Sequence, residues 1–220
     1  MKMKSNPTVS QLDLGVEYTL IKELRFHEIK PFILKIISKR DKLINFYVLY
    51  QTIALATLII LVAFHIYNAL INEAYHIQNF YWILTALLFS FSVLVVIHEL
   101  MHALAYSVLG KKQLKFGADI KKFIFYVHAH MQVVNRKELI LVAITPFILV
   151  HLVCVPLTII FWHSPLSLFF LVVLLAHALF CAGDFAMISF FLRQKKSEMY
   201  TYDDSRKKLA RFYIKKADIE

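Results

Sequence analysis

The segment "VVIHELMHALAYSVLG", from Val95 to Gly110, places two histidines and a glutamate inside an otherwise apolar run. The region around it, residues 44–110, contains no Lys or Arg. Because about 20 apolar residues suffice for a helix to cross a lipid bilayer, the region predicts membrane-spanning helices. An acidic side chain near the bilayer centre costs about 2.5–3.5 kcal/mol on insertion scales, so Glu99 needs a chemical reason to be there.

The composition supports a membrane protein. Hydrophobic residues make up 59% of the 220, whereas soluble domains usually contain about 45–50%. Two cation-free blocks, 44–110 and 138–192, are each long enough for two spans joined by a short turn. We therefore predict four spans, which cover about residues 44–70, 80–109, 139–162 and 165–192.

All 25 Lys and Arg fall in three segments, residues 1–43, 111–137 and 193–220. Since basic flanks stay in the cytoplasm, we expect a multi-pass protein of the cell membrane with both termini in the cytoplasm. Basic segments can also bind nucleic acid, but these carry no interleaved recognition motif, and lysines beside anionic lipid are ordinary. We therefore expect no nucleic-acid partner. The lipid bilayer is itself an expected partner. The oligomeric state stays open.

The predicted fold class is an all-α membrane protein with about four transmembrane helices and a short β-hairpin-like loop at the membrane surface between helices two and three. The loop, residues 111–137, is rich in β-branched and aromatic residues, which favour strands. Gly117 and Asp119 are expected to mark the bend between two strands. An amphipathic loop without strands is the alternative.

Three domains follow from this division. Residues 1–43 form a cytoplasmic segment whose apolar residues have the spacing of an interfacial amphipathic helix. Residues 44–192 form the four-span membrane domain, and residues 193–220 a basic cytoplasmic tail, expected to be loosely docked or partly disordered. The helical spacing involves Ile29, Phe32, Ile33, Ile36 and Ile37.

His98 and His102 are four residues apart, so both project from one face of a helix, one turn apart. Two imidazoles in this arrangement can bind one zinc ion. Glu99 is rotated by about 100° around the helix axis, so it lies beside the metal, where it can accept a proton from water. This is the His-Glu-x-x-His pattern of zinc peptidases, with Glu99 as the catalytic base.

Asp184 is the best candidate for a third ligand. It lies nine residues before Arg193, and His102 lies nine residues before Lys111, so the two side chains are expected at similar depths in the membrane. Gly183 would permit close approach of the helices. Two acids buried in different spans are explained together if they share one cation.

Other roles for these residues stay open. The paired histidines could bind haem or form hydrogen bonds between helices, and Asp184 could belong to an ion pathway. His177 lies seven residues before Asp184 and could replace or assist it, as could His151. For both, the role of an ordinary interior histidine is also open. Cys154 and Cys181 fall inside predicted spans and do not indicate a disulfide.

The order of motifs along the chain resembles that of a known family. "HELMHALAY" in a span is followed by "KFG" and "YV" in a basic strand-like loop, "ITPF" at the start of a span and "GD" in the last span. Over residues 85–205 this is similar to the small bacterial membrane proteins known as putative zincin peptidases, and more distantly to site-2 proteases. The latter usually carry Asp before Gly, whereas here Gly183 precedes Asp184.

The resemblance implies one zinc ion at His98, His102 and Asp184, with Glu99 as base. The function expected is that of a zinc-dependent, membrane-embedded peptidase that hydrolyses a membrane-associated protein or peptide substrate. The alternative is a non-catalytic zinc-binding scaffold, sensor or ion carrier. Glu99 distinguishes the two, because a structural metal site has no use for a free base.

Overall fold

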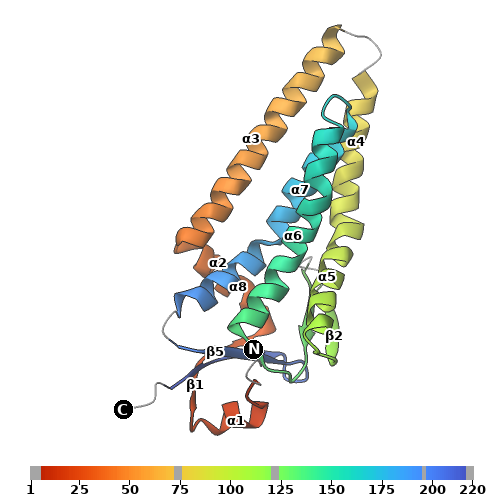
Figure 1. Ribbon diagram of the computed structural model, residues 1–220. Helices are drawn as coiled ribbons and strands as arrows, with labels where there is room; N and C mark the ends of the chain where they lie inside the picture. Colours follow the sequence, from red (N-terminus) through yellow and green to blue (C-terminus); the bar gives the residue numbers. More distant parts are fainter. Residues whose placement is uncertain (1–5, 72–75, 120–123, 195–196, 217–220) are drawn as a thin grey trace.

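The computed structural model describes residues 6–71, 76–119, 124–194 and 197–216. Figure 1 shows a long bundle of helices that stands on a small β-sheet, with both ends of the chain on the sheet side. The helices of the bundle are α3 (Lys42–Ile71), α4 (His76–Phe89), the π-helical turn η2 (Ser90–Leu94), α5 (Val95–Val108), α6 (Arg136–Ile160), α7 (Leu166–Phe180) and α8 (Ala182–Arg193).

Three apolar helices, Lys42–Ile71, Tyr81–Val108 and Arg136–Ile160, are long enough to cross a membrane. The fourth predicted span consists of two helices, α7 and α8, which meet at an angle of 44°. Together they would make a fourth crossing. The prediction of about four spans therefore agrees with the structure, except that the last one is broken at Cys181.

The helices of the bundle expose large apolar side chains on their outer faces. Ile59 on α3, Leu104 on α5 and Leu152 on α6 are each more than half exposed. Leu61 and Leu168, in contrast, are fully enclosed between the helices. A soluble protein rarely exposes contiguous apolar surface of this kind, so these outer faces suit contact with lipid.

The sheet corrects the all-α prediction. Strands β1 (Tyr18–Arg25), β4 (Val134–Asn135), β5 (Met199–Asp204) and β6 (Leu209–Lys215) form an antiparallel sheet in the order β1-β6-β5-β4. The C-terminal segment, expected to be loosely docked, supplies its two central strands. Tyr202 and Phe212 are almost completely buried there. The pairing of β1 with β6 joins segments about 190 residues apart, which local sequence patterns do not reveal.

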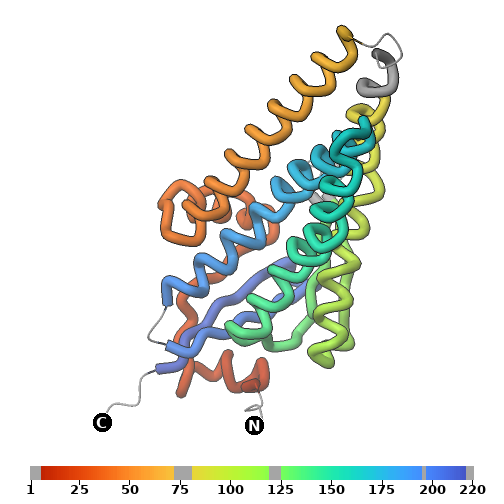
Figure 2. The backbone as a smooth tube through the Cα atoms, turned by 45° about the horizontal axis from the view of Figure 1, so that its top comes forward, coloured from red at the N-terminus to blue at the C-terminus, as the bar shows by residue number. Residues whose placement is uncertain are grey.

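The N-terminal segment contains the predicted amphipathic helix, α2 (Phe26–Ser38), preceded by the short helix α1 (Val9–Leu14). Ile36 on α2 is buried, and Phe32 packs edge-on against Phe190 of α8 with 5.1 Å between ring centres. Figure 2 shows α2 and α8 side by side, below the lower end of α3. The helix therefore connects the sheet to the bundle.

The predicted hairpin between spans two and three is confirmed. Strand β2 (Leu114–Asp119) pairs antiparallel with β3 (Ile124–Ala129). Gly117 was wrongly expected at the bend: it lies within β2 opposite Tyr126, where a Cβ atom would overlap the tyrosine ring. The bend itself falls outside the described residues. Gly117 thus serves close packing inside the hairpin.

The sheet also constrains the topology. Its strands come from all three basic segments of the chain, because β1 precedes α3, β4 precedes α6, and β5 and β6 follow α8. A hydrogen-bonded sheet cannot be divided by a bilayer. The described parts of the N-terminal segment, the 111–137 loop and the C-terminal segment consequently meet in one sheet at one end of the bundle; that they lie on the cytoplasmic side of a membrane stays a prediction from charge.

Candidate metal centre

Helix α5 carries the His-Glu-x-x-His pattern. His98 and His102 are both buried, with 6% and 8% of their surface exposed. Their ring centres are 4.7 Å apart, and their Nε2 atoms lie 3.1 Å from each other. The spacing of four residues therefore does bring the two imidazole rings to one point, as the sequence predicted.

Asp184 reaches the same point from the first turn of α8. Its Oδ2 atom lies 3.4 Å from His98 Nε2, and its Oδ1 atom lies 3.3 Å from His102 Nε2. Helix α8 begins directly after the break at Cys181 and packs against α6, and its Asp184 side chain contacts the two histidines of α5. Of the candidate ligands from sequence, the structure therefore brings together His98, His102 and Asp184.

The donor atoms of this group fit a zinc ion. Two atoms that each lie about 2.0–2.1 Å from a common tetrahedral centre are about 3.3 Å apart, close to the three distances found. Asp184 Oδ2 is buried and accepts no hydrogen bond from the described part of the chain. Such an orphaned oxygen beside two imidazole nitrogens is costly unless a cation compensates it.

A second set of contacts orients the two imidazoles. His102 Nδ1 lies 3.0 Å from the carbonyl oxygen of Val142 on α6, to which it donates its proton. His98 Nδ1 lies 3.2 Å from Nε2 of His177 on α7, which is completely buried. When a ligand histidine forms a hydrogen bond through one ring nitrogen, the other nitrogen is free to bind metal. Both Nε2 atoms are therefore presented to the centre.

His98, His177 and Cys181 form a second group whose donor atoms are close enough for a metal. The Sγ atom of Cys181 lies 3.8 Å from His177 Nδ1, and all three residues are buried. The two groups share His98. Cys181 was not among the ligands predicted from sequence, although His177 and Cys181 have the same spacing of four residues as His98 and His102 and therefore share a helical face.

Glu99 belongs to neither group among the described residues, and its role as base stays a prediction. Its carboxylate lies near the backbone of Val127 on β3, and helix α5 packs against this strand. The hairpin therefore packs against the face of α5 that carries the candidate base.

The other histidines considered from sequence lie outside the metal groups of the described residues. His151 contacts the hydroxyl of Tyr50 at 2.5 Å and the carbonyl of Phe147 at 2.6 Å. His128 and His130 both contact the Ser205 hydroxyl, at 2.5 and 3.0 Å. Burial and the neighbouring His130 lower the pKa of His128 to about 4. These contacts link the hairpin to the sheet.

Fold and site together define a class: a multi-helix membrane-type protein with a buried His-His-Asp group on a His-Glu-x-x-His helix. Residues 91–199 match the model of a family described as "Putative zincin peptidase", and the chain belongs to this family. The matched segment begins in η2 and ends at the first residue of β5, so it includes both metal groups. No curated protein and no solved structure matches the chain.

Proposed function

We propose that the protein is a zinc-dependent, membrane-embedded peptidase that hydrolyses peptide bonds of a membrane-associated substrate. The observation that carries this proposal is the convergence of His98 Nε2, His102 Nε2 and the partly buried Asp184 carboxylate at distances of 3.1–3.4 Å. Membership of the zincin family supports the same conclusion.

In the proposed mechanism His98, His102 and Asp184 hold the zinc ion. When bound, zinc would supply Lewis-acid chemistry, which polarises the scissile carbonyl and makes water a better nucleophile near neutral pH. Glu99 accepts the proton of the attacking water and then donates it to the leaving amine nitrogen. Val142 and His177 keep the two histidine rings in the orientation that this chemistry needs.

The hairpin is the proposed docking site for the substrate. A substrate helix must unwind before cleavage, because its carbonyl groups are already hydrogen-bonded. Among the described residues, β2 is paired only with β3, so its other edge can accept an extended peptide. The contact between Val127 and Glu99 places this hairpin beside the proposed base.

A non-catalytic zinc scaffold is the second candidate, and one observation favours it. His98, His177 and Cys181 are all buried and include a thiol, as in structural zinc sites, which are closed to water. The scaffold, however, gives no role to Glu99. A substitution at Glu99 therefore separates the two functions.

The decisive experiment compares the wild-type protein with Glu99→Gln, which keeps the shape of the side chain and removes its basicity. Each purified protein is analysed for zinc, and membrane-protein fragments are compared between cells that produce one or the other. We expect about one zinc per chain in both proteins. Fragments that the wild type generates should fall by about 10²–10⁴-fold with Glu99→Gln, the usual contribution of a general base.

Two variants serve as controls. His98→Ala should lose the zinc, whereas His151→Ala should retain it, because His151 lies in the same bundle but outside both metal groups. Fragment patterns that do not differ between wild type and Glu99→Gln would rule out the peptidase mechanism. Zinc retained in Glu99→Gln without any cleavage by the wild type would leave the scaffold as the function.

A further inference from the structure

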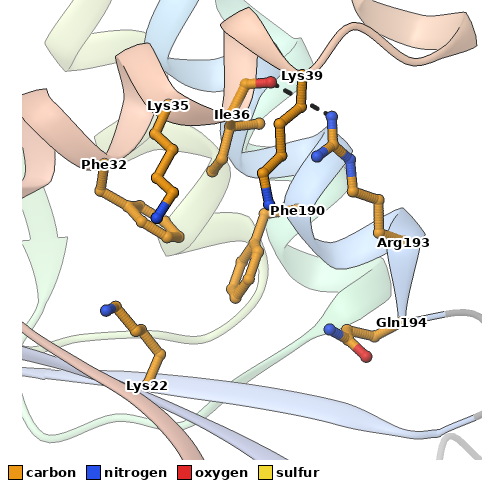
Figure 3. Close-up of a pocket in the computed structure, with 8 residues that line it drawn as sticks. All are labelled: Lys22, Phe32, Lys35, Ile36, Lys39, Phe190, Arg193 and Gln194. Atoms are coloured by element: carbon orange, nitrogen blue, oxygen red, sulfur yellow. Dashed lines mark hydrogen bonds between the residues drawn. The ribbon is translucent and has the colours of Figure 1, made fainter.

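A small cavity lies between α2, the end of α8 and β1, away from the metal centre. Its volume is about 270 Å³, just under the range of about 300–1,000 Å³ that is typical of small-molecule sites. Figure 3 shows Lys35 extending from α2, Lys39 from the residue that follows this helix, and Lys22 approaching from β1 on the opposite side. The rings of Phe32 and Phe190 form an apolar floor between them.

The cavity carries an excess of positive charge. Four of its eight lining residues are basic, and none is acidic. Arg193 is held by Asp41, with 2.9 Å between Nε and Oδ2, and by the carbonyl of Ile36. The lysines are exposed and have no such partner among the described side chains; Lys22 lies 6.0 Å above the Phe32 ring. Like charges around one cavity repel each other unless an anion compensates them.

The position of the cavity indicates where this anion comes from. Arg193 is the last residue of α8, and α2 leads directly into α3, which starts at Lys42. The cavity therefore lies at the level where two apolar helices leave the membrane, on the side that holds the sheet (Figure 1). Close by in sequence, Leu34 and Phe46 are each 58% exposed, so apolar surface continues from α2 into α3.

We propose that this cavity binds the phosphate headgroup of an anionic phospholipid from the surrounding membrane. The lysines neutralise the phosphate, and the aromatic floor contacts the glycerol and the first methylenes of the acyl chains. The same chemistry would accept inorganic phosphate, but only a lipid also uses the apolar floor and the adjacent exposed apolar surface.

The test measures lipid binding to the purified full-length protein by native mass spectrometry, with phosphatidylglycerol and with phosphatidylcholine of the same acyl chains. We expect the wild type to bind phosphatidylglycerol at least about tenfold more tightly than phosphatidylcholine. The double variant Lys35→Gln, Lys39→Gln should bind phosphatidylglycerol about tenfold or more weakly than the wild type, because each cation near a lipid phosphate changes the affinity by a fewfold. Both lysines are exposed, so the fold should tolerate the substitutions.

The matched control is Lys112→Gln, Lys207→Gln, which removes two exposed lysines on the same side of the membrane but outside the cavity. This variant should bind phosphatidylglycerol within twofold of the wild type. Equal losses in the two double variants, or equal affinity for the two lipids, would overturn the site. If millimolar inorganic phosphate displaces the lipid completely, the occupant is not a lipid. If the lipid stays bound, the assignment of a phospholipid is supported.

Discussion

His98 has a contact at each of its ring nitrogens. Nε2 faces His102 and Asp184, and Nδ1 faces His177. If Nε2 binds zinc, His177 fixes the orientation of the ring. Loss of such a partner typically weakens metal affinity about 10- to 100-fold. We therefore expect His177→Ala to weaken zinc binding by that factor in competition with a chelator.

Two further variants test whether His177 acts only through packing. His177→Gln keeps a hydrogen-bonding group near His98 and should recover most of the affinity. His65→Ala removes an equally buried histidine, which contacts Ser167, and should lower stability without changing zinc affinity. If His65→Ala weakens zinc as much as His177→Ala does, His177 has no specific effect on the site.

The choice between the two metal groups depends on Asp184 and Cys181. If zinc lies between His98, His102 and Asp184, Asp184→Ala should reduce the zinc content of the purified protein to a small fraction, because one of three protein ligands is lost. Cys181→Ala should retain about one zinc per chain. Elemental analysis of both variants gives the answer. The reverse result, zinc kept without Asp184 and lost without Cys181, would assign the metal to the second group.

The sequence predicted part of this site for a simple reason. The helical period places His98 beside His102 independently of the tertiary packing. An acid inside an apolar segment, such as Asp184, indicates a cationic partner. The contact between His98 and His177 could not be predicted in the same way. It depends on how α7 is placed against α5, which is a matter of packing between distant segments.

At the scale of the helices, Asp41 stabilises the junction between α2 and α3. Its carboxylate accepts hydrogen bonds from the N–H of Ile44 at 2.9 Å, the Ser189 hydroxyl at 2.5 Å and Arg193 Nε at 2.9 Å. Burial alone would raise the pKa of Asp41, but these bonds outweigh it and lower the pKa from 3.8 to about 2. Asp41 thus caps α3 and ties α8 to it.

This lowered pKa predicts a pH dependence of stability. A carboxyl group with a lower pKa in the folded state stabilises the fold above its unfolded pKa, and the contribution disappears as the pH falls from about 4 to about 2. Asp41→Asn removes the charge but keeps a capping group. We expect it to lower stability near pH 7 by about 1 kcal/mol, because the ion pair is partly exposed. Thermal unfolding in detergent measures the difference.

The difference between wild type and Asp41→Asn should persist down to about pH 4 and close toward pH 2. Glu17→Gln, at an exposed position, is the control for general effects of charge and should match the wild type throughout. A difference that stays constant from pH 5 to pH 2 would show that the ionised carboxylate is not the stabilising group.

Helices were easier to predict than strands in this chain. The apolar blocks and the spacing of Ile29, Phe32 and Ile36 are local signals, and they predicted the spans and α2. Strands β1, β5 and β6 have no apolar block of their own, and they are stabilised by pairing across most of the chain length. The π-turn η2 contains no Pro or Gly that would mark it, whereas the 44° bend at Cys181 has only Gly183, two residues later, as a local signal.

At the scale of the whole molecule, the sheet and the charge distribution give independent information. Charge predicts which side of the membrane the basic segments occupy. The order β1-β6-β5-β4 requires only that they share a side. Because the two arguments use different residues, a single labelling experiment can test each of them separately.

Single cysteines at three exposed positions make this test. Val16→Cys and Lys207→Cys lie on the sheet side, and His163→Cys lies in the turn between α6 and α7 at the other end of the bundle. An impermeant maleimide applied to intact cells should label only His163→Cys, whereas permeabilised cells should show all three. The native Cys154 and Cys181 are buried, so the unsubstituted protein is the blank.

Labelling of Val16→Cys and Lys207→Cys from outside, without His163→Cys, would reverse the orientation but keep the sheet. Labelling of one but not the other would contradict the sheet itself, because β1 and β6 cannot pair across a bilayer.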